Sequence, residues 1–408
     1  MVAVAKRRFL DQVDMNDHEK KNLQILDAIR KKGPITRAEI SRFIGLNIVT
    51  VTSYVDQYIK KNVIQEVGIE VSSGGRKPTL VDFSPNTVFL IGVGLNISDM
   101  VAVLCSPKGD IVYSVKKERP PASGEELVVT MMSLVEELLQ KSKADPDKVH
   151  GIGIGIPGIF NRETNSVRWS AGLLQDDFQI TVSIHSLFEE KFGIPTIVDN
   201  DANAAVFGEE WYGKGSGAQH AIYLHSAYGC GILIHGQIYR GSTGSAGEWL
   251  FEYEKESSSN DAALVTRPGS WGMDLGIVSS AHAAQKDHGT SQIYALCEND
   301  PHRINFMTVV KAAEAGDMLA NRLLREAGQR LGRKAAFLVN LFNPDVLIVG
   351  GGLEAAGAPF LDGVREQVKN IAIPEATDRL RVVPSTLGEN SVPLGAAAFL
   401  AQNYFISI

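Results

Sequence analysis

Residues 198–205 place an acid and two amides at the point where an apolar run, typical of a strand, gives way to a helical pattern. The acid is Asp201 and the amides are Asn200 and Asn203, and a second acid, Asp199, precedes them. A carboxylate such as Asp201 is suited to take a proton or a hydrogen bond from a hydroxyl group of a ligand. The alternative is structural, because Asn200 or Asp201 would also satisfy the free N–H groups of a helix's first turn. Both interpretations stay open from the sequence.

Two glycine-rich segments have the composition of phosphate-binding turns. Residues 151–158 contain GxGxxG, but a dinucleotide-binding motif needs its last glycine to open a helix, whereas Pro157-Gly158 and the hairpin-like residues 161–165 point to a loop. Alternating glycines in a strand more simply let another backbone or a ligand approach closely. Residues 350–352 are three glycines after an apolar strand, and such a turn suits a phosphate or an adenosine.

A different polar surface is predicted near the N-terminus. A helix over residues 22–29 ends at Gly33-Pro34, and Thr36 with Glu39 forms a capping box for a second, short helix. Gly45 supplies a turn, and a third helix then runs to about Lys60. Its apolar side chains are predicted to pack inward: Ile48, Val51, Val55, Tyr58 and Ile59. Its opposite face carries hydrogen-bonding side chains suited to a DNA major groove: Thr50, Thr52, Ser53, Asp56 and Gln57.

The segment after these helices strengthens that interpretation, since an isolated pair of helices with a polar face is often only solvated surface. Residues 63–67 and 79–83 read as two strands, and the loop between them holds Arg76 and Lys77 beside two glycines. A hairpin with a basic, flexible tip is what a wing needs to contact phosphate or a minor groove. The order of helix, helix, turn, helix and basic wing predicts double-stranded DNA binding.

Composition sets the limits for the rest of the chain. With 408 residues, 44% hydrophobic and 21% charged, it is long enough for two or three globular domains. No apolar run approaches the roughly 20 residues that span a bilayer, so we expect a cytoplasmic protein without a membrane partner. Residues 1–83 carry 14 Lys and Arg against 10 Asp and Glu, whereas the remainder carries 26 against 37. Only the N-terminal part is therefore suited to phosphate.

The larger part of the chain contains a weak internal repeat. Strands predicted at 89–94, 100–104 and 109–113 have counterparts at 221–224, 231–234 and 236–239, and helical stretches follow near 124–142 and 306–341. Two similar halves of this kind predict a duplicated α/β domain with a ligand cleft between its lobes.

Together these segments resemble the ROK family, named for its repressors, uncharacterised frames and sugar kinases. The resemblance covers nearly the whole chain and rests on residues 75–78, 155–158, 200–203, 239–248 and 343–352. It implies a winged helix-turn-helix followed by an actin-like ATPase fold, a sugar in the interlobe cleft, and a dimer or tetramer. It also implies effector contacts from Gly158, Asn200, Asp201 and Glu248, with Asp201 matching the catalytic base of the family's kinases.

At several positions the chain departs from the family pattern, and these departures bear on kinase activity and zinc binding. The acid of the first phosphate loop is replaced by Gly94, followed by Leu95 and Asn96. Losing it should remove most phosphoryl transfer even with Asp201 kept, so no catalytic role and no bound ATP are expected. The family's zinc motif is absent, since residues 250–260 contain neither His nor Cys, and the three cysteines form no CxxC pair. We therefore expect no zinc or other metal. The asparagine of another family sugar contact falls at Gly172.

These observations predict a DNA-binding transcriptional regulator, a repressor of carbohydrate genes controlled by a sugar or sugar derivative. The predicted domains are residues 1–83, the DNA-binding head, and residues 84–408, the effector and oligomerisation domain. Its lobes are expected at about 84–200 and 201–390, with a C-terminal helix returning to the first lobe. The alternative is a ROK-type sugar kinase with an accessory N-terminal domain, in which Asp201 is the base.

Overall fold

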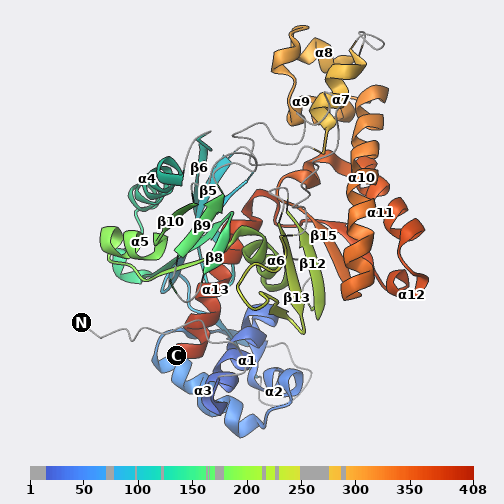
Figure 1. Ribbon diagram of the computed structural model, residues 1–408. Coiled ribbons are helices and arrows are strands. Elements are labelled where there is room, and N and C mark those ends of the chain that lie inside the picture. The colour runs from blue at the N-terminus through green and yellow to red at the C-terminus, as the bar shows by residue number, and fades with distance from the viewer. Residues whose placement is uncertain are drawn as a thin grey trace.

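The computed structural model describes residues 15–69, 78–96, 99–120, 124–161, 164, 166–170, 179–213, 217–225, 229–248, 275–285 and 291–408. Figure 1 shows a small helical head beneath two larger lobes. The elements of the head are α1 (Asp17–Lys32), β1 (Ile35–Thr36), α2 (Arg37–Ile44), α3 (Ile48–Lys60), β2 (Ile64–Ile69) and β3 (Thr79–Phe83).

The helices α2 and α3 begin and end where their capping residues predict, whereas α1 is longer than the predicted 22–29 because a capping box of Asn16 and Glu19 starts it earlier. Thr36 and Glu39 form the expected capping box at the start of α2, and Gly45 ends that helix in the left-handed region at φ 73°. The Asn47 side chain caps α3 by accepting from the Val49 amide. The strand β1 was not predicted. It pairs with β3, so that the sheet has the order β1-β3-β2 and closes the winged helix-turn-helix.

The first lobe is built on a five-stranded sheet with the order β11-β7-β4-β5-β6. Its elements are β4 (Phe89–Leu95), β5 (Asp99–Cys105), β6 (Ile111–Glu118), α4 (Gly124–Ser142), the turn η2 (Pro146–Lys148), β7 (Val149–Ile156), α5 (Ile184–Phe192) and β11 (Thr196–Asn200). Three further strands form a separate sheet at its side: β8 (Ile159–Asn161), β9 (Ser166–Ser170) and β10 (Gln179–Val182).

The second lobe repeats this plan with the order β14-β13-β12-β15-β16. Its sheet strands are β12 (His220–Leu224), β13 (Cys230–Ile234), β14 (Gln237–Ile238), β15 (Val346–Val349) and β16 (Arg381–Pro384). In both sheets three antiparallel strands are extended by two parallel ones. The internal repeat predicted from the sequence is thus confirmed as an actin-like duplication.

The helices of the second lobe cover its outer face and its far end. They are α7 (Ile277–Ala284), α8 (Gln292–Leu296), α9 (Phe306–Glu314), α10 (Met318–Phe342), α11 (Gly357–Ile371) and α12 (Pro374–Thr377), with the turns η4 (Pro301–Arg303), η5 (Leu353–Ala356) and η6 (Gly388–Asn390). The helical stretch predicted over 306–341 is two helices, because Gly316 adopts φ 87° and Asp317 caps the start of α10.

Two helices, α6 (Asp201–Trp211) and α13 (Ser391–Ser407), lie in the middle of the molecule (Figure 1). They share one hydrophobic core with the inner faces of both sheets, as shown by Leu90 of β4 and Tyr223 of β12. A Cβ at Gly92 or Gly153 would come within 2.2 Å of a carbonyl oxygen of α13. The glycines of these strands therefore serve close packing of α13 on β4 and β7.

The same core continues into the head. Apolar side chains of α1, such as Leu26 and Ile29, belong to it together with Trp211 at the end of α6 and Phe405 at the end of α13. The Arg30 guanidinium lies 4.3 Å from the centre of the Trp211 ring and also donates to the Trp211 carbonyl. The head and the rest of the chain, residues 84–408, which we call the body, are thus joined by packed side chains. Here α1 contacts the last turn of α6.

Candidate DNA interface and effector site

The outer face of α3 holds the residues predicted to read DNA. Ser53 and Gln57 are exposed, whereas Thr50 and Thr52 are half-buried at its edges. Val51, Val55 and Tyr58 are buried on the opposite face, as predicted. Ile48 was predicted to pack inward with them, and that prediction is wrong, because 43% of Ile48 is exposed at the first position of the helix.

The turn before α3 fixes the direction of this face. The Ser41 hydroxyl donates to the Leu46 carbonyl across the turn at 2.6 Å. Along α3, the Asp56 carboxylate accepts from the Arg37 guanidinium at 2.9 Å, and Arg37 also contacts Glu66 of β2. These contacts tie α3 to α2 and to the hairpin, so the helix would be presented as a rigid unit.

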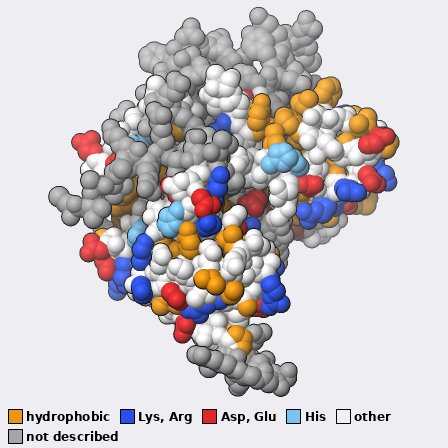
Figure 2. Space-filling view, turned by 90° about the horizontal axis from the view of Figure 1, so that it is seen from below, with side chains coloured by type: hydrophobic (Ala, Val, Ile, Leu, Met, Phe, Trp, Pro, Cys, Tyr) orange, Lys and Arg blue, Asp and Glu red, His pale blue; other side chains and the backbone are white. Residues whose placement is uncertain are grey.

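The hairpin that would form the wing is present, with β2 antiparallel to β3 and a bulge between Glu66 and Gly68. Arg76 and Lys77, the predicted basic tip, lie outside the described residues, so their role stays a prediction. Figure 2 looks at the head from below. Hydrophobic side chains lie on that face, with Lys and Arg side chains towards its edges.

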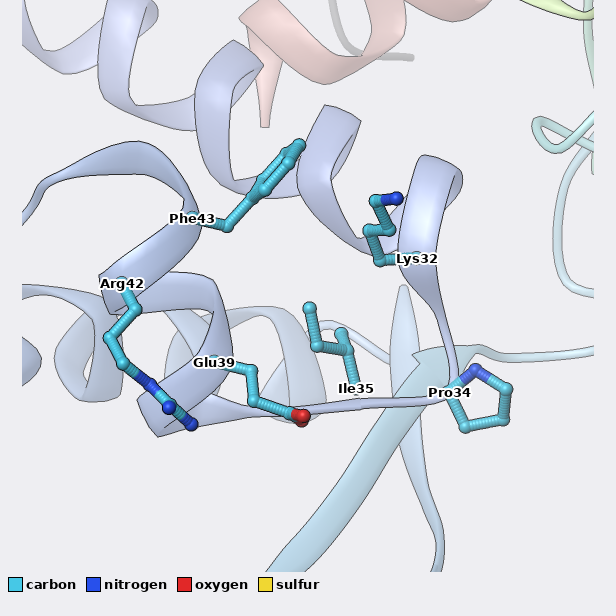
Figure 3. A pocket seen from close by; sticks show the side chains of 6 residues that line it. All are labelled: Lys32, Pro34, Ile35, Glu39, Arg42 and Phe43. Atoms are coloured by element: carbon cyan, nitrogen blue, oxygen red, sulfur yellow. The ribbon is translucent and has the colours of Figure 1, made fainter.

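A shallow hollow lies between the end of α1 and α2 (Figure 3). It is lined by Lys32, Pro34, Ile35, Glu39, Arg42 and Phe43. The Glu39 carboxylate is engaged in the capping box with Thr36, and those hydrogen bonds hold its pKa below the usual value. The Phe43 ring lies 5.7 Å from the Lys32 ammonium. The hollow is therefore a basic flank of the head.

The predicted effector residues meet where β11 enters α6. The Asn200 side chain caps α6 by accepting from the amides of Ala202 and Asn203, so the structural interpretation of this residue is confirmed. Its amide group donates to the Gly158 carbonyl at 3.1 Å, which brings two of the predicted residues together. Gly158 has φ 114°, a conformation that favours glycine.

Asp201 is buried beside Asn200 and keeps one oxygen available. Its Oδ1 accepts from the Ala202 amide at 2.8 Å, whereas its Oδ2 accepts no hydrogen bond from the described residues. That oxygen lies 3.7 Å from Nδ1 of His225, a buried ring whose pKa is lowered by burial. A buried carboxylate oxygen without a donor is a group that a ligand hydroxyl would satisfy.

Glu248 belongs, with Asn200, Asp201 and His225, to what we call the polar cluster. Burial, together with the charge of Asp201, raises the pKa of Glu248 to about 7. Arg119 also interacts with Asp201, and burial lowers the pKa of Arg119 to about 10. The Arg119 guanidinium donates to the Asn96 carbonyl at 3.1 Å.

His225, Arg119 and Asn96 were not predicted as site residues. Asn96 and His225 directly follow β4 and β12, which are the corresponding central strands of the two lobes. The internal repeat was therefore the signal that could have found them, because ligands of α/β sheets bind at the carboxyl ends of strands.

The segment 239–248 is held to this cluster by an ion pair. The buried Asp199 accepts from the Arg240 guanidinium at 2.6 Å and from the side-chain Nδ2 of Asn203 at 3.1 Å. Asp199 is the residue before Asn200, so this pair places the loop that carries Glu248 next to the start of α6.

Gly94, at the position of the family's first phosphate loop, and the glycine turn 350–352 are both filled by the chain itself. A Cβ at Gly94 would lie within 2.7 Å of Pro393 and Val392 in the first turn of α13. In the turn 350–352, the Gly351 amide donates to the Tyr223 hydroxyl and the Gly352 amide donates to the Glu354 carboxylate. These two N–H groups are thus occupied by side chains rather than open to a phosphate.

Within the described ranges, no group of three or more His, Cys, Asp or Glu side chains is placed to hold a metal. The zinc prediction and the position of Gly172 concern residues outside those ranges and stay predictions. Among the described helices, none has the length and apolar character to cross a bilayer.

Comparison with known proteins agrees with this architecture. The ROK family model matches residues 90–403, and a model of winged helix-turn-helix DNA-binding domains matches residues 19–65. The chain is 28% identical to a xylose repressor of Caldicellulosiruptor bescii over 93% of its length and 95% of the repressor.

Two further relatives differ in how much of the chain they cover. The chain is 30% identical to a glucokinase of Thermotoga maritima over 77% of its length and 97% of the kinase. It also resembles the crystal structure of a ROK family transcriptional regulator, a homologue of the Escherichia coli Mlc protein. That match has a TM-score of 0.68 and 22% identity, and covers 95% of this chain and 97% of the other. With a family model matching more than half of its residues, the chain belongs to the ROK family.

Proposed function

We propose that this ROK protein is a sugar-responsive transcriptional repressor that binds operator DNA through its head. The observation that carries the proposal is the winged helix-turn-helix, whose core is continuous with the body that holds the polar cluster. Two relatives that cover nearly the whole chain are named a xylose repressor and a ROK family transcriptional regulator. A repressor that binds operator DNA would act in the cytoplasm.

In this proposal, Thr50, Thr52, Ser53 and Gln57 contact base edges, and Arg76 and Lys77 contact phosphate or a minor groove. Asn200, Asp201, Glu248 and the Gly158 loop contact a hydroxyl-rich effector. The missing zinc motif and Gly172 remove several of the family's sugar contacts, so the effector's identity is to be found by screening.

The contact between α6 and α1 supports a route for control. Asn200 and Asp201 lie at the start of α6, and Trp211 at its end packs on Arg30 of the head. An effector that binds one lobe arrangement more tightly would shift α6 and, with it, the head. The effector must distinguish the two arrangements, since equal affinity would change nothing.

The kinase alternative is supported by Asp201 and by the resemblance of the body to glucokinases. Against it, the Gly94 position has no room for an acidic side chain, and the 350–352 turn is occupied by Tyr223 and Glu354. We therefore propose that phosphoryl transfer has been lost and that the body binds neither ATP nor a metal.

Two assays test the proposal. Fluorescence anisotropy with duplexes recovered by in vitro selection should show tight binding that changes on adding a sugar, with D-xylose and N-acetylglucosamine as the first probes. A coupled ADP-release assay with the same sugars and common hexoses should show no turnover. Turnover in the ordinary enzyme range of about 1–1000 per second, without DNA binding, would establish the kinase instead.

A further inference from the structure

Two exposed apolar side chains stand at the tip of α3, where the proposed function needs contact with DNA. Val49 is 73% exposed and Ile48 is 43% exposed, at the second and first positions of the helix. The three buried residues Val51, Val55 and Tyr58 already fill the inner face of α3. The two exposed side chains are therefore not needed for the core of the head.

A third exposed apolar side chain nearby has a different environment. Phe43 lies near the end of α2 and lines the hollow of Figure 3, where its ring centre is 5.7 Å from the Lys32 ammonium. Val49 and Ile48 thus form a separate apolar tip, one helical turn before the exposed Ser53.

The chemistry of this tip selects among the groups that a major groove offers. The first turn of α3 contains no acidic residue, and its only basic residue at either end is Lys60 in the last turn. The tip therefore has no side-chain charge with which to bind phosphate. Val and Ile cannot form hydrogen bonds with the donors and acceptors on base edges. The one apolar group in a major groove is the C5-methyl group of thymine.

We propose that Val49, with Ile48 beside it, packs on thymine methyl groups and so fixes thymine at one or two positions of each operator half-site. The inference rests on the proposed function and adds to it the base that the tip of α3 reads. The N-terminal residues of a recognition helix are those that reach base edges, which fits the first two positions of α3. Ser53 and Gln57 would read neighbouring bases through hydrogen bonds.

The test removes the apolar group from either side of the contact, the C5-methyl group of thymine or the two methyl groups of Val49. Duplexes are first recovered by in vitro selection with the full-length protein, and each selected thymine is then replaced by deoxyuridine, which keeps the pairing edge and lacks only the methyl group. Affinity is measured by anisotropy for the wild type and for Val49→Ala. The control is Val129→Ala, a 59% exposed valine on α4 in the body.

The expected result is an affinity loss of about fourfold per sensitive thymine in the wild type and in the control, which is the value of one buried methyl group. In Val49→Ala the loss at one of these positions disappears, because the partner side chain is gone. Selected half-sites without a fixed thymine, or a deoxyuridine effect that Val49→Ala leaves unchanged, would overturn the inference. If no duplex is selected at all, the proposed function itself fails, and that outcome is distinguishable from the other two.

Discussion

At the scale of single residues, the polar cluster differs from a solvated surface because its charges are buried close together. Asp201 interacts electrostatically with Glu248 and Arg119, and Nδ1 of His225 lies 3.7 Å from Oδ2 of Asp201. Burying a carboxyl group disfavours its charged form, and a neighbouring carboxylate adds to that effect. Such a site is costly for the chain to maintain, and a ligand would relieve part of the cost.

Glu248 should make the stability of the protein depend on pH in a measurable way. Its pKa is raised to about 7, so the folded state holds a proton on Glu248 that the unfolded state has already released above its ordinary pKa of 4.5. This group therefore makes the protein less stable as pH rises from about 4.5 to 7. Replacing Glu248→Gln removes that slope, and the Tm difference, variant minus wild type, should grow between pH 5 and pH 8. A difference that stays constant over this range would contradict the raised pKa of Glu248.

At the scale of elements, α6 is held at both ends. Its start is capped by Asn200, and near its end the buried Glu209 carboxylate accepts from the Ser385 hydroxyl, the Thr386 amide and hydroxyl, and the Leu387 amide. These bonds tie α6 to the segment between β16 and α13. The helix is thus fixed to the second sheet as well as to the head.

Glu209→Ala should therefore destabilise the protein by about 3 kcal/mol, because it leaves several buried donors without an acceptor. Glu314→Ala, at an exposed position of α9, is the control and should change stability by less than about 0.5 kcal/mol. Urea unfolding of both variants measures the difference. Equal midpoints for the two would show that the Glu209 contacts do not hold α6.

Several of the helices and strands could be predicted from the sequence, and others could not. Caps, turns and apolar spacing predicted α2, α3 and the hairpin, and the repeated strand pattern predicted the duplicated sheets, because these signals are local or periodic. The two-residue strand β1 was missed, since its pairing with β3 depends on a contact over 44 residues or more, from Ile35 to Val81 and from Thr36 to Leu80. Ile48 was misplaced because helical spacing alone cannot show that the inner face of α3 is complete without it.

At the scale of the whole molecule, the contact between Arg30 and Trp211 is the proposed connection between effector and DNA. Arg30→Ala should leave DNA binding in place and reduce the effect of the effector on DNA affinity. Coupling between sites is typically about 5- to 150-fold, and we expect the variant to keep less than about threefold. Arg303→Ala, at an exposed position outside this contact, should retain the full response. A full response in Arg30→Ala would exclude this connection.

A two-fold symmetric operator would require at least two copies of the protein to assemble. Phe337 and Leu341 are 80% and 73% exposed one turn apart on α10. The exposed Ile373 is held near them, because its backbone N–H donates a hydrogen bond to Oδ1 of Asn340 on the same helix. We propose that this face binds a second copy of the chain. Phe337→Glu should convert a dimer or tetramer to a smaller species in sedimentation, whereas Val129→Glu on α4 should not. A wild type that sediments as a monomer would contradict the proposal.

The most direct measurement is an anisotropy titration of a selected duplex with the full-length protein, repeated with each sugar of a panel. Specific repressors bind with a Kd of about 10⁻⁸ to 10⁻¹¹ M, at least about 1000-fold tighter than random DNA. A sugar-responsive repressor should show a Kd in this range and a change of about fivefold or more with one sugar. Equal affinity for selected and random duplexes, unaffected by any sugar, would contradict it.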